Sequence, residues 1–190
     1  MPTLKALMAC AAAAEGRTTP PAAVEEVNQG LSDPLALLAA GKIDLAWIFE
    51  GWQGVQARRS GLQLDLVRLA DQRDCVPDYY TPILIGRQEM LDEQPERVRA
   101  FVGAVAKGYA NAIADPAAAA EVLLKAVPEL DPGLVRESQA WLSPRYQDDA
   151  SRWGQQRPEV WQAYADWLLA QGLLASPLDS SGAFDNRFLP

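Results

Sequence analysis

The first part of the chain carries short apolar runs separated by segments with helical spacing. Apolar residues recur at helical intervals over 3–14, which predicts a helix. Helices are also expected at 34–40, where a cap residue in Ser32-Asp33-Pro34 precedes the proline, and at 52–60, which ends at Gly61. The apolar runs between and after these helices are too short for a helix and are typical of strands. The expected strands are 23–28, 43–49, 63–70 and 79–86. Alternating helices and strands predict an α/β domain over residues 1–86 with a mostly parallel sheet.

The character of the chain changes after Gly86, and residues 87–190 predict helices without a convincing strand. Pro95 opens a long helix whose apolar residues form one stripe. Asp115-Pro116 and Asp131-Pro132 each start a further helix, because a capping carboxylate precedes a proline in the first turn. A last strong helix is expected from Pro158 to Gln171, and its apolar face holds Val160, Trp161, Tyr164, Trp167 and Leu168. The apolar stripes of this half need a surface to pack on, which predicts a missing partner sheet or self-association.

Composition narrows the possible functions. The net charge of −8 argues against a nucleic-acid-binding protein, which needs a basic surface. The chain has no histidine, which removes histidine bases, Ser-His pairs and most zinc sites. Cys10 and Cys75 are far apart in the sequence, and we expect two free thiols rather than a disulfide. No cofactor, no metal and no membrane span are predicted, and the apolar stretch before Cys10 is too short for a credible signal peptide.

One candidate site follows the predicted strand 43–49. Ligands of α/β proteins usually bind beyond the carboxyl ends of the strands. Gly51 lies at such an end, where a glycine lets the backbone turn and lets a ligand approach closely. Trp47 and Trp52 offer flat faces for stacking, and the Glu50 carboxylate can accept hydrogen bonds from an amino-heterocycle. The alternative is that both tryptophans are core residues and that Glu50 caps the following helix.

Other aromatic residues allow two interpretations. Tyr79 and Tyr80 flank the start of the predicted strand 79–86, where one of them could face a cleft. Alternatively, the segment is a rigid loop with Pro77 and Pro82 as its turn residues. Aromatics beside arginines near helix ends favour packing with cation–π support over ligand binding. The residues in this second group are Trp141, Arg145, Tyr146, Arg152, Trp153 and Gln156. No phosphate-binding glycine loop and no acid/base pair of carboxylates stand out.

Several blocks together resemble a known family. The chain is similar to the solute-binding proteins of ABC importers for thiamine-pyrimidine precursors and related flat heterocycles. The blocks that carry this resemblance are "VEEVNQGLSDPLALLAAGKIDLAWIFEGWQGVQARRSG", "PDYYTPILIGRQEMLDEQPERVRAFVGAVAKGYANAIADPAAAAEVLLK", "SQAWLSPRYQDDASRWGQQRPEVWQAYADWL" and "AFDNRFL". They follow one another in order and cover nearly the whole chain.

The resemblance implies a type II periplasmic-binding-protein-like fold whose two lobes close on a ligand. Residues 1–86 would form the second α/β lobe, and 87–190 would be helices of the first lobe. A small aromatic heterocycle would be bound by Trp47, Glu50, Trp52, Tyr79 and Tyr80. The family also implies an ABC permease as partner and a periplasmic or extracellular lipoprotein location.

The chain departs from the family pattern at its start. Family members begin with an export signal and a first-lobe segment that supplies sheet and ligand contacts, so we expect this chain to be N-terminally truncated. The leading hypothesis is a solute-binding module for a thiamine pyrimidine precursor. The alternative is a non-transport interaction module or degenerate fragment that self-associates through uncovered helices. An enzyme like the fungal pyrimidine synthase, which resembles this fold, is disfavoured because it needs histidine.

Overall fold

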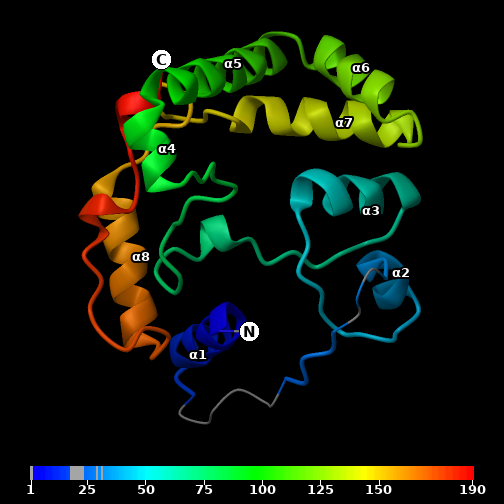
Figure 1. Ribbon diagram of the computed structural model, residues 1–190. Helices are drawn as coiled ribbons and strands as arrows, with labels where there is room; N and C mark the ends of the chain where they lie inside the picture. The colour runs from blue at the N-terminus through cyan, green and yellow to red at the C-terminus, as the bar shows by residue number, and fades with distance from the viewer. Residues whose placement is uncertain (1, 18–23, 29, 31) are drawn as a thin grey trace. The chain divides into compact units, whose positions relative to one another are not determined.

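The computed structural model describes residues 2–17, 24–28, 30 and 32–190, and regular structure in these residues is helical (Figure 1). The α-helices are α1 (Pro2–Ala14), α2 (Pro34–Ala39), α3 (Val55–Ser60), α4 (Gln88–Glu93), α5 (Pro95–Ala114), α6 (Pro116–Ala126), α7 (Pro132–Leu142) and α8 (Pro158–Ala170). A π-helical turn, η1 (Glu50–Gly54), leads into α3. The 3₁₀ turns are η2 (Leu69–Asp71), η3 (Ser143–Arg145), η4 (Ser180–Gly182) and η5 (Asn186–Phe188).

Local capping explains where the predicted helices begin. The carboxylates of Asp33, Asp115 and Asp131 accept hydrogen bonds from backbone N–H groups in the first turns of α2, α6 and α7. A proline follows each of these aspartates, at a position that needs no N–H partner. The helix expected at 52–60 ends at Ser60, because Gly61 adopts a left-handed conformation with φ +73°. The cap-and-proline predictions are therefore confirmed.

The predicted sheet is not confirmed, because no strand forms in the described part of the chain. The segments 43–49 and 79–86 lack regular secondary structure, and 63–70 ends in the turn η2. Strands are stable only when neighbouring strands satisfy their backbone groups. Several apolar side chains of these segments are exposed, including Phe49 at 65% and Ile85 at 88%. The α/β assignment of residues 1–86 is replaced, for the described residues, by helices joined by irregular segments.

The chain folds into two compact units that interleave along the sequence. One unit comprises residues 1–28, 66–86 and 156–186, and the other comprises 29–65, 87–155 and 187–190. We call them the α8 unit and the α7 unit after their central helices. The division predicted at residue 86 stays a prediction about lobes of the whole protein.

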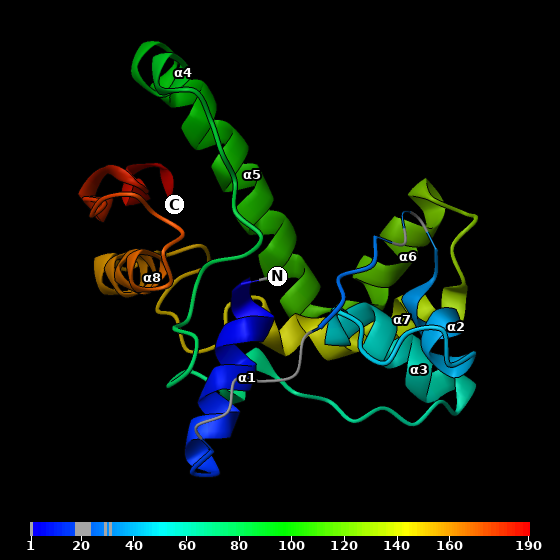
Figure 2. The same ribbon diagram turned by 90° about the horizontal axis from the view of Figure 1, so that it is seen from below.

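In the α7 unit, helices pack around a small apolar core. Helices α6 and α7 lie side by side, and α5 contacts α6 (Figures 1 and 2). Val55 and Val135 are 2% and 1% exposed, so α3 packs against α7 through well-buried side chains. The Arg59 guanidinium also joins α3 to α7 by pairing with Asp131 and Glu137. The apolar stripe on α5 is only partly covered, since Phe101 is 58% exposed and its other members are half-buried.

In the α8 unit, long-range links hold irregular segments to helices. A disulfide joins Cys10 of α1 to Cys75, 65 residues later, so the expectation of two free thiols was wrong. Sequence spacing does not reveal such a pair, because the Cα atoms come within 5.7 Å only after folding. The turn η4 lies beside α8, where the Ser180 hydroxyl donates a hydrogen bond to Gln162.

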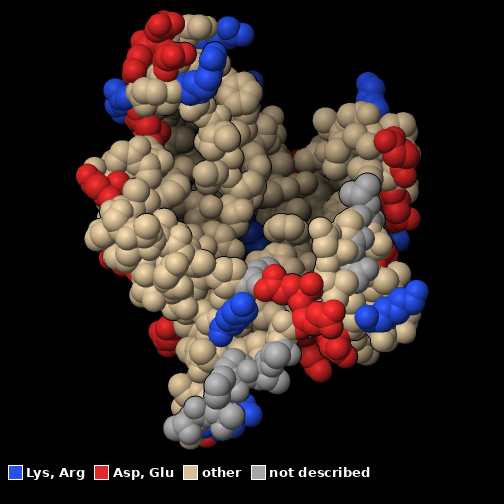
Figure 3. Space-filling view, turned by 60° about the horizontal axis from the view of Figure 1, so that its bottom comes forward, with Lys and Arg blue, Asp and Glu red and all other residues tan. Residues whose placement is uncertain are grey.

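Charged side chains are unevenly distributed over the surface shown in Figure 3. On the face shown in Figure 3, acidic side chains gather in groups and broad areas carry no charge. Among the described residues, no helix is both long enough and apolar enough to cross a membrane.

Candidate functional site: an aromatic pocket on α8

Tyr79 and Tyr80 lie on a loop that several contacts fix to α8. The backbone N–H groups of Cys75 and Val76 both bond to the Gln72 carbonyl, which forms a tight turn. Val76 is 2% exposed and anchors this turn in the interior of the unit. The indole N–H of Trp167 on α8 donates to the Cys75 carbonyl at 3.1 Å. The loop therefore presents its two tyrosines toward one face of α8.

Helix α8 supplies the opposite wall of the pocket. Its residues Trp161 and Tyr164 are three positions apart, which places them on one helical face. The Tyr79 ring stacks on Tyr164 with centroids 4.8 Å apart and an interplanar angle of 25°. Tyr80 and Trp161 are more open, with centroids 6.3 Å apart and ring planes tilted by 40°. The wider spacing between Tyr80 and Trp161 leaves an opening between the loop and the helix.

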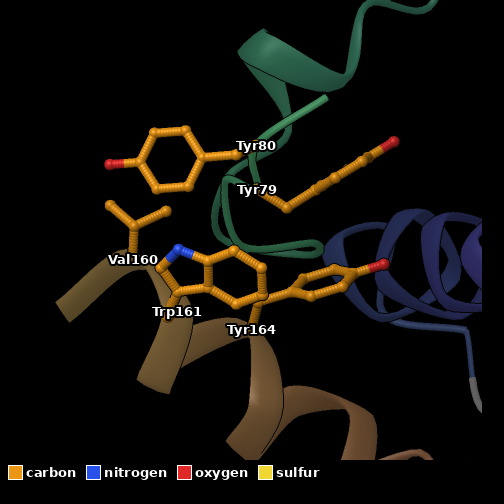
Figure 4. A pocket seen from close by; sticks show the side chains of 5 residues that line it. All are labelled: Tyr79, Tyr80, Val160, Trp161 and Tyr164. Carbon is orange, nitrogen blue, oxygen red and sulfur yellow. The ribbon is translucent and has the colours of Figure 1, made fainter. Parts of the chain in front are cut away.

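The opening is a small aromatic pocket (Figure 4). Its volume is about 80 Å³. Figure 4 shows Tyr79 and Tyr80 on the loop across from the helix that carries the other wall. The lining residues are Tyr79, Tyr80, Val160, Trp161 and Tyr164. None of these side chains is charged, so the pocket offers mainly ring faces and methyl groups to a ligand.

Hydrogen bonds to neighbouring groups hold the rings of the pocket. The Tyr80 hydroxyl accepts a bond of 2.9 Å from the backbone N–H of Arg157. The Trp161 indole N–H donates to the Gln156 carboxamide oxygen at 2.7 Å. Gln156 is itself fixed, because its backbone N–H and carbonyl bond the Asn186 side chain at 3.1 and 2.8 Å. Rings held in this way are pre-organised for stacking, which limits the entropy lost on binding.

The Tyr164 hydroxyl stays protonated well beyond neutral pH. Partial burial raises its pKa above the ordinary value, and the neighbouring Tyr79 raises the pKa further. The Tyr164 side chain is therefore neutral at physiological pH. The ring faces of the pocket offer dispersion and stacking to a ligand.

The other three predicted ligand residues belong to the α7 unit. Trp47 is 42% exposed on the segment before η1, and Trp52 is half-buried within η1. Glu50 lies in the first turn of η1, and Phe49 rather than Glu50 occupies the cap position. The structure thus places Tyr79 and Tyr80 in one pocket and does not include Trp47, Glu50 or Trp52 in that pocket.

Gly51 has a structural explanation that the sequence did not suggest. We expected this glycine to let a ligand approach the backbone. Instead, a Cβ atom at this position would lie 2.6 Å from Leu142 Cδ2 of α7. The Gly51 carbonyl also accepts a hydrogen bond from the Ser138 hydroxyl. Close packing of η1 on α7 is therefore what requires glycine here.

Sequence reasoning missed Val160, Trp161 and Tyr164, which it assigned to the apolar packing face of the last helix. Packing does involve this face, since Trp161 stacks on Phe184 and Tyr164 stacks on Trp167. The i, i+3 spacing of Trp161, Tyr164 and Trp167 was the available signal. The predicted cation–π packing is confirmed at Arg145, whose guanidinium lies 3.8 Å from the Trp141 ring centroid.

Known proteins share long stretches with this chain. The chain is 27% identical over 161 residues to the riboflavin-binding protein RibY of Chloroflexus aurantiacus, covering 82% of this chain and 45% of the relative. It is 30% identical over 115 residues to a formylaminopyrimidine-binding protein of Halalkalibacterium halodurans, covering 58% of this chain and 35% of the relative. The chain thus spans less than half of the length of either curated relative. The model of the family described as "NMT1/THI5 like" matches residues 2–119, more than half of the chain. The chain belongs to the NMT1/THI5-like family, whose members include solute-binding proteins.

Proposed function

We propose that this chain is the solute-binding component of an ABC importer for a flat nitrogen heterocycle, in particular a thiamine pyrimidine precursor. The observation that carries the proposal is the pocket of Tyr79, Tyr80, Val160, Trp161 and Tyr164. Its walls are ring faces held by hydrogen bonds, as stacking of a flat ring requires. The names of the two relatives, which bind riboflavin and formylaminopyrimidine, support the same ligand class.

The size of the pocket favours a single ring over a fused ring system. Complete small-molecule sites usually measure about 300–1,000 Å³. A pocket of about 80 Å³ accommodates one six-membered ring and leaves a three-ring flavin mostly outside. Of the two ligands named for the relatives, the pyrimidine fits this pocket better.

Transport, rather than catalysis, is the proposed role, with an ABC permease as partner and an extracytoplasmic location. The Cys10–Cys75 disulfide supports this location, because disulfides persist in oxidising compartments. Trp47, Glu50 and Trp52 remain proposed ligand residues of the α7 unit, where Glu50 would accept hydrogen bonds from a heterocycle.

Calorimetric titration of the chain with a hydroxymethyl-aminopyrimidine and with riboflavin tests the proposal. We expect the pyrimidine to bind more tightly than riboflavin. Trp161→Ala should weaken pyrimidine binding by about 1–3 kcal/mol, the range for stacking of a base on an aromatic side chain. Trp161→Phe keeps a ring and should retain most of the affinity.

Phe101→Ala serves as the matched control, because Phe101 is an exposed aromatic residue of α5 outside the pocket. If Trp161→Ala and Phe101→Ala lose equal amounts of pyrimidine affinity, the pocket on α8 is not the binding site. If neither aminopyrimidines nor flavins produce a binding signal in calorimetry, the proposed ligand class is wrong.

A second candidate function is an interaction module that self-associates. The exposed side chains of Val67, Ile85 and Val122 favour it, at 71%, 88% and 71% exposure. Exposed apolar patches commonly mark protein–protein contacts. The mass of the chain in solution, measured with and without the pyrimidine, separates this candidate from a monomeric binding module.

A further inference from the structure

The disulfide is attached close to the aromatic pocket. Cys75 lies four residues before Tyr79 and is bonded to Cys10 on α1. Both cysteines are only half-buried, so a small reductant can reach the bond. The link thus joins an accessible redox group to the loop that carries one wall of the pocket.

Non-covalent contacts also hold this loop near its cysteine, and Val76 beside it is 2% exposed. The Cys75 carbonyl accepts one hydrogen bond from Trp167, and the backbone of the turn contributes two bonds to Gln72. Beyond the turn, Tyr79 is held by its stack on Tyr164, and Tyr80 by the Arg157 N–H. No regular secondary structure is present between Gln72 and Arg87. To these contacts the disulfide adds a covalent tie between the turn and α1.

We propose that the Cys10–Cys75 disulfide is a redox-sensitive site that controls the aromatic pocket. With the bond intact, α1 and the Gln72–Val76 turn hold Tyr79 and Tyr80 against α8. Reduction frees Cys75 from α1, the loop samples other positions, and the pocket wall is present in only a fraction of molecules. This inference rests on the proposed function, since ligand affinity is the property that the switch would change.

The chemistry is a thiol–disulfide exchange with a dithiol reductant. A thiolate of the reductant attacks one cysteine sulfur, the bond between Cys10 and Cys75 breaks, and the other cysteine leaves as a thiolate. The second thiol of the reductant then displaces the first protein sulfur. The reductant ends as its own disulfide, and the protein gains two electrons and two protons as two thiols. Oxidation by a disulfide of more positive potential reverses the sequence.

Hydrogen exchange on the full chain, with and without dithiothreitol, tests the switch directly. The amides of Cys75 and Val76 have hydrogen-bond partners in the turn and should be protected in the oxidised chain. After reduction we expect faster exchange at these amides and unchanged exchange in α5, α6 and α7, which serve as the internal reference. Unchanged exchange in the turn would overturn the proposal. Loss of protection throughout the chain would also overturn it, because the bond would then be only a structural support.

Titration with a hydroxymethyl-aminopyrimidine provides the functional measurement. If the closed pocket is present in about a tenth of the reduced molecules, the dissociation constant rises about tenfold. The double variant Cys10→Ser, Cys75→Ser should bind like the reduced chain and ignore dithiothreitol. If this variant does not fold, the titration of the native chain against the reductant decides alone.

The outcomes separate the inference from the proposed function. An oxidised chain that binds the pyrimidine, with the same affinity after reduction, overturns the switch and leaves the proposed function standing. An oxidised chain that binds no pyrimidine overturns the proposed function, and the control of ligand affinity falls with it.

Discussion

At the scale of single residues, Glu50 is the carboxylate whose role most needs a direct test. It is half-buried at the start of η1, and its Cγ atom lies against Gly54, where a Cβ would come within 2.9 Å. If Glu50 accepts hydrogen bonds from an amino-heterocycle, Glu50→Gln should weaken binding by roughly 1.5–3 kcal/mol, as for bonds to charged groups. Calorimetry measures this loss, and thermal unfolding should show little change.

Glu93→Gln is the matched control for this substitution. Glu93 is an exposed glutamate at the end of α4, so its neutralisation changes the net charge equally. Equal affinities of the two variants, with lower stability only in Glu50→Gln, would assign Glu50 a structural role in η1.

The raised pKa of Tyr164 predicts how the free energy of unfolding depends on pH. Its pKa in the folded state is raised by burial and by Tyr79, so the folded chain holds this proton more tightly than the unfolded chain. The contribution to stability is complete below the tyrosine pKa of the unfolded chain, about 10, and is lost as pH rises through the folded value. We expect no effect of this group between about pH 6 and 9, and falling stability above about pH 10.

Tyrosinate absorbance during a pH titration, combined with denaturant unfolding, measures this effect. Tyr164→Phe removes the group and should reduce the alkaline loss. Tyr146 in the α7 unit has a pKa raised mainly by burial, so Tyr146→Phe shows how much of the loss is common to buried tyrosines. An alkaline loss that is unchanged in Tyr164→Phe would contradict the prediction.

At the scale of elements, the start of α7 combines a cap with an ion pair. The Asp131 carboxylate accepts a hydrogen bond from the Leu134 N–H and also pairs with Arg59 of α3. Removal of a capping carboxylate costs about 1 kcal/mol, and a partly exposed ion pair adds about 0–1 kcal/mol. Asp131→Ala should therefore lower the free energy of unfolding by about 1–2 kcal/mol.

Asp115→Ala provides the comparison within the same unit. Asp115 caps α6 through the Ala118 N–H, and its carboxylate forms no ion pair with any residue that the structure describes. We expect a smaller loss, about 1 kcal/mol, from this substitution. Denaturant unfolding measures the decrease in the free energy of unfolding in both variants. A larger decrease in Asp115→Ala than in Asp131→Ala would show that the ion pair with Arg59 contributes nothing to stability.

At the scale of the whole molecule, exposed apolar segments predict self-association. Ile85 and Val67 are 88% and 71% exposed on segments without regular secondary structure, and exposed apolar surface commonly marks protein–protein contacts. We expect a concentration-dependent mass in sedimentation and binding of a hydrophobic dye. Ile85→Lys should reduce both, because a charged side chain opposes burial in an apolar contact between chains.

Ala104→Lys adds the same charge at an exposed position of α5 and should leave association largely unchanged. A monodisperse monomer that binds no dye would contradict the prediction. Equal effects of the two lysines would assign the change to net charge rather than to the segment around Ile85.

The pocket also limits the affinity expected of this chain. A volume of about 80 Å³ surrounds one ring, whereas complete sites bury most of their ligand. The favourable free energy from contacts to one ring is largely offset by the entropy cost of association, so little net binding free energy remains. We expect dissociation constants of about 100 μM or weaker for the aminopyrimidine, which corresponds to roughly −5.5 kcal/mol. Submicromolar binding by a monomer in calorimetry would show a more complete site than the pocket on α8.

The sequence by itself determined the features that depend on neighbouring residues. Asp33, Asp115 and Asp131 with their prolines defined helix starts, and Gly61 defined a helix end, because capping and left-handed geometry involve only a few adjacent positions. The apolar runs were also identified, but their conversion into strands was not confirmed, because a strand requires a partner that no local pattern supplies.

Only the tertiary structure decided which distant residues meet. The pocket joins Tyr79 and Tyr80 to Trp161 and Tyr164, which are about eighty positions away in the sequence. The disulfide joins residues separated by 65 positions, and Gly51 owes its identity to Leu142. Such contacts depend on the path of the whole chain and on the packing of its helices. Their residues are visible in the sequence, whereas their partners become known only when the chain is folded.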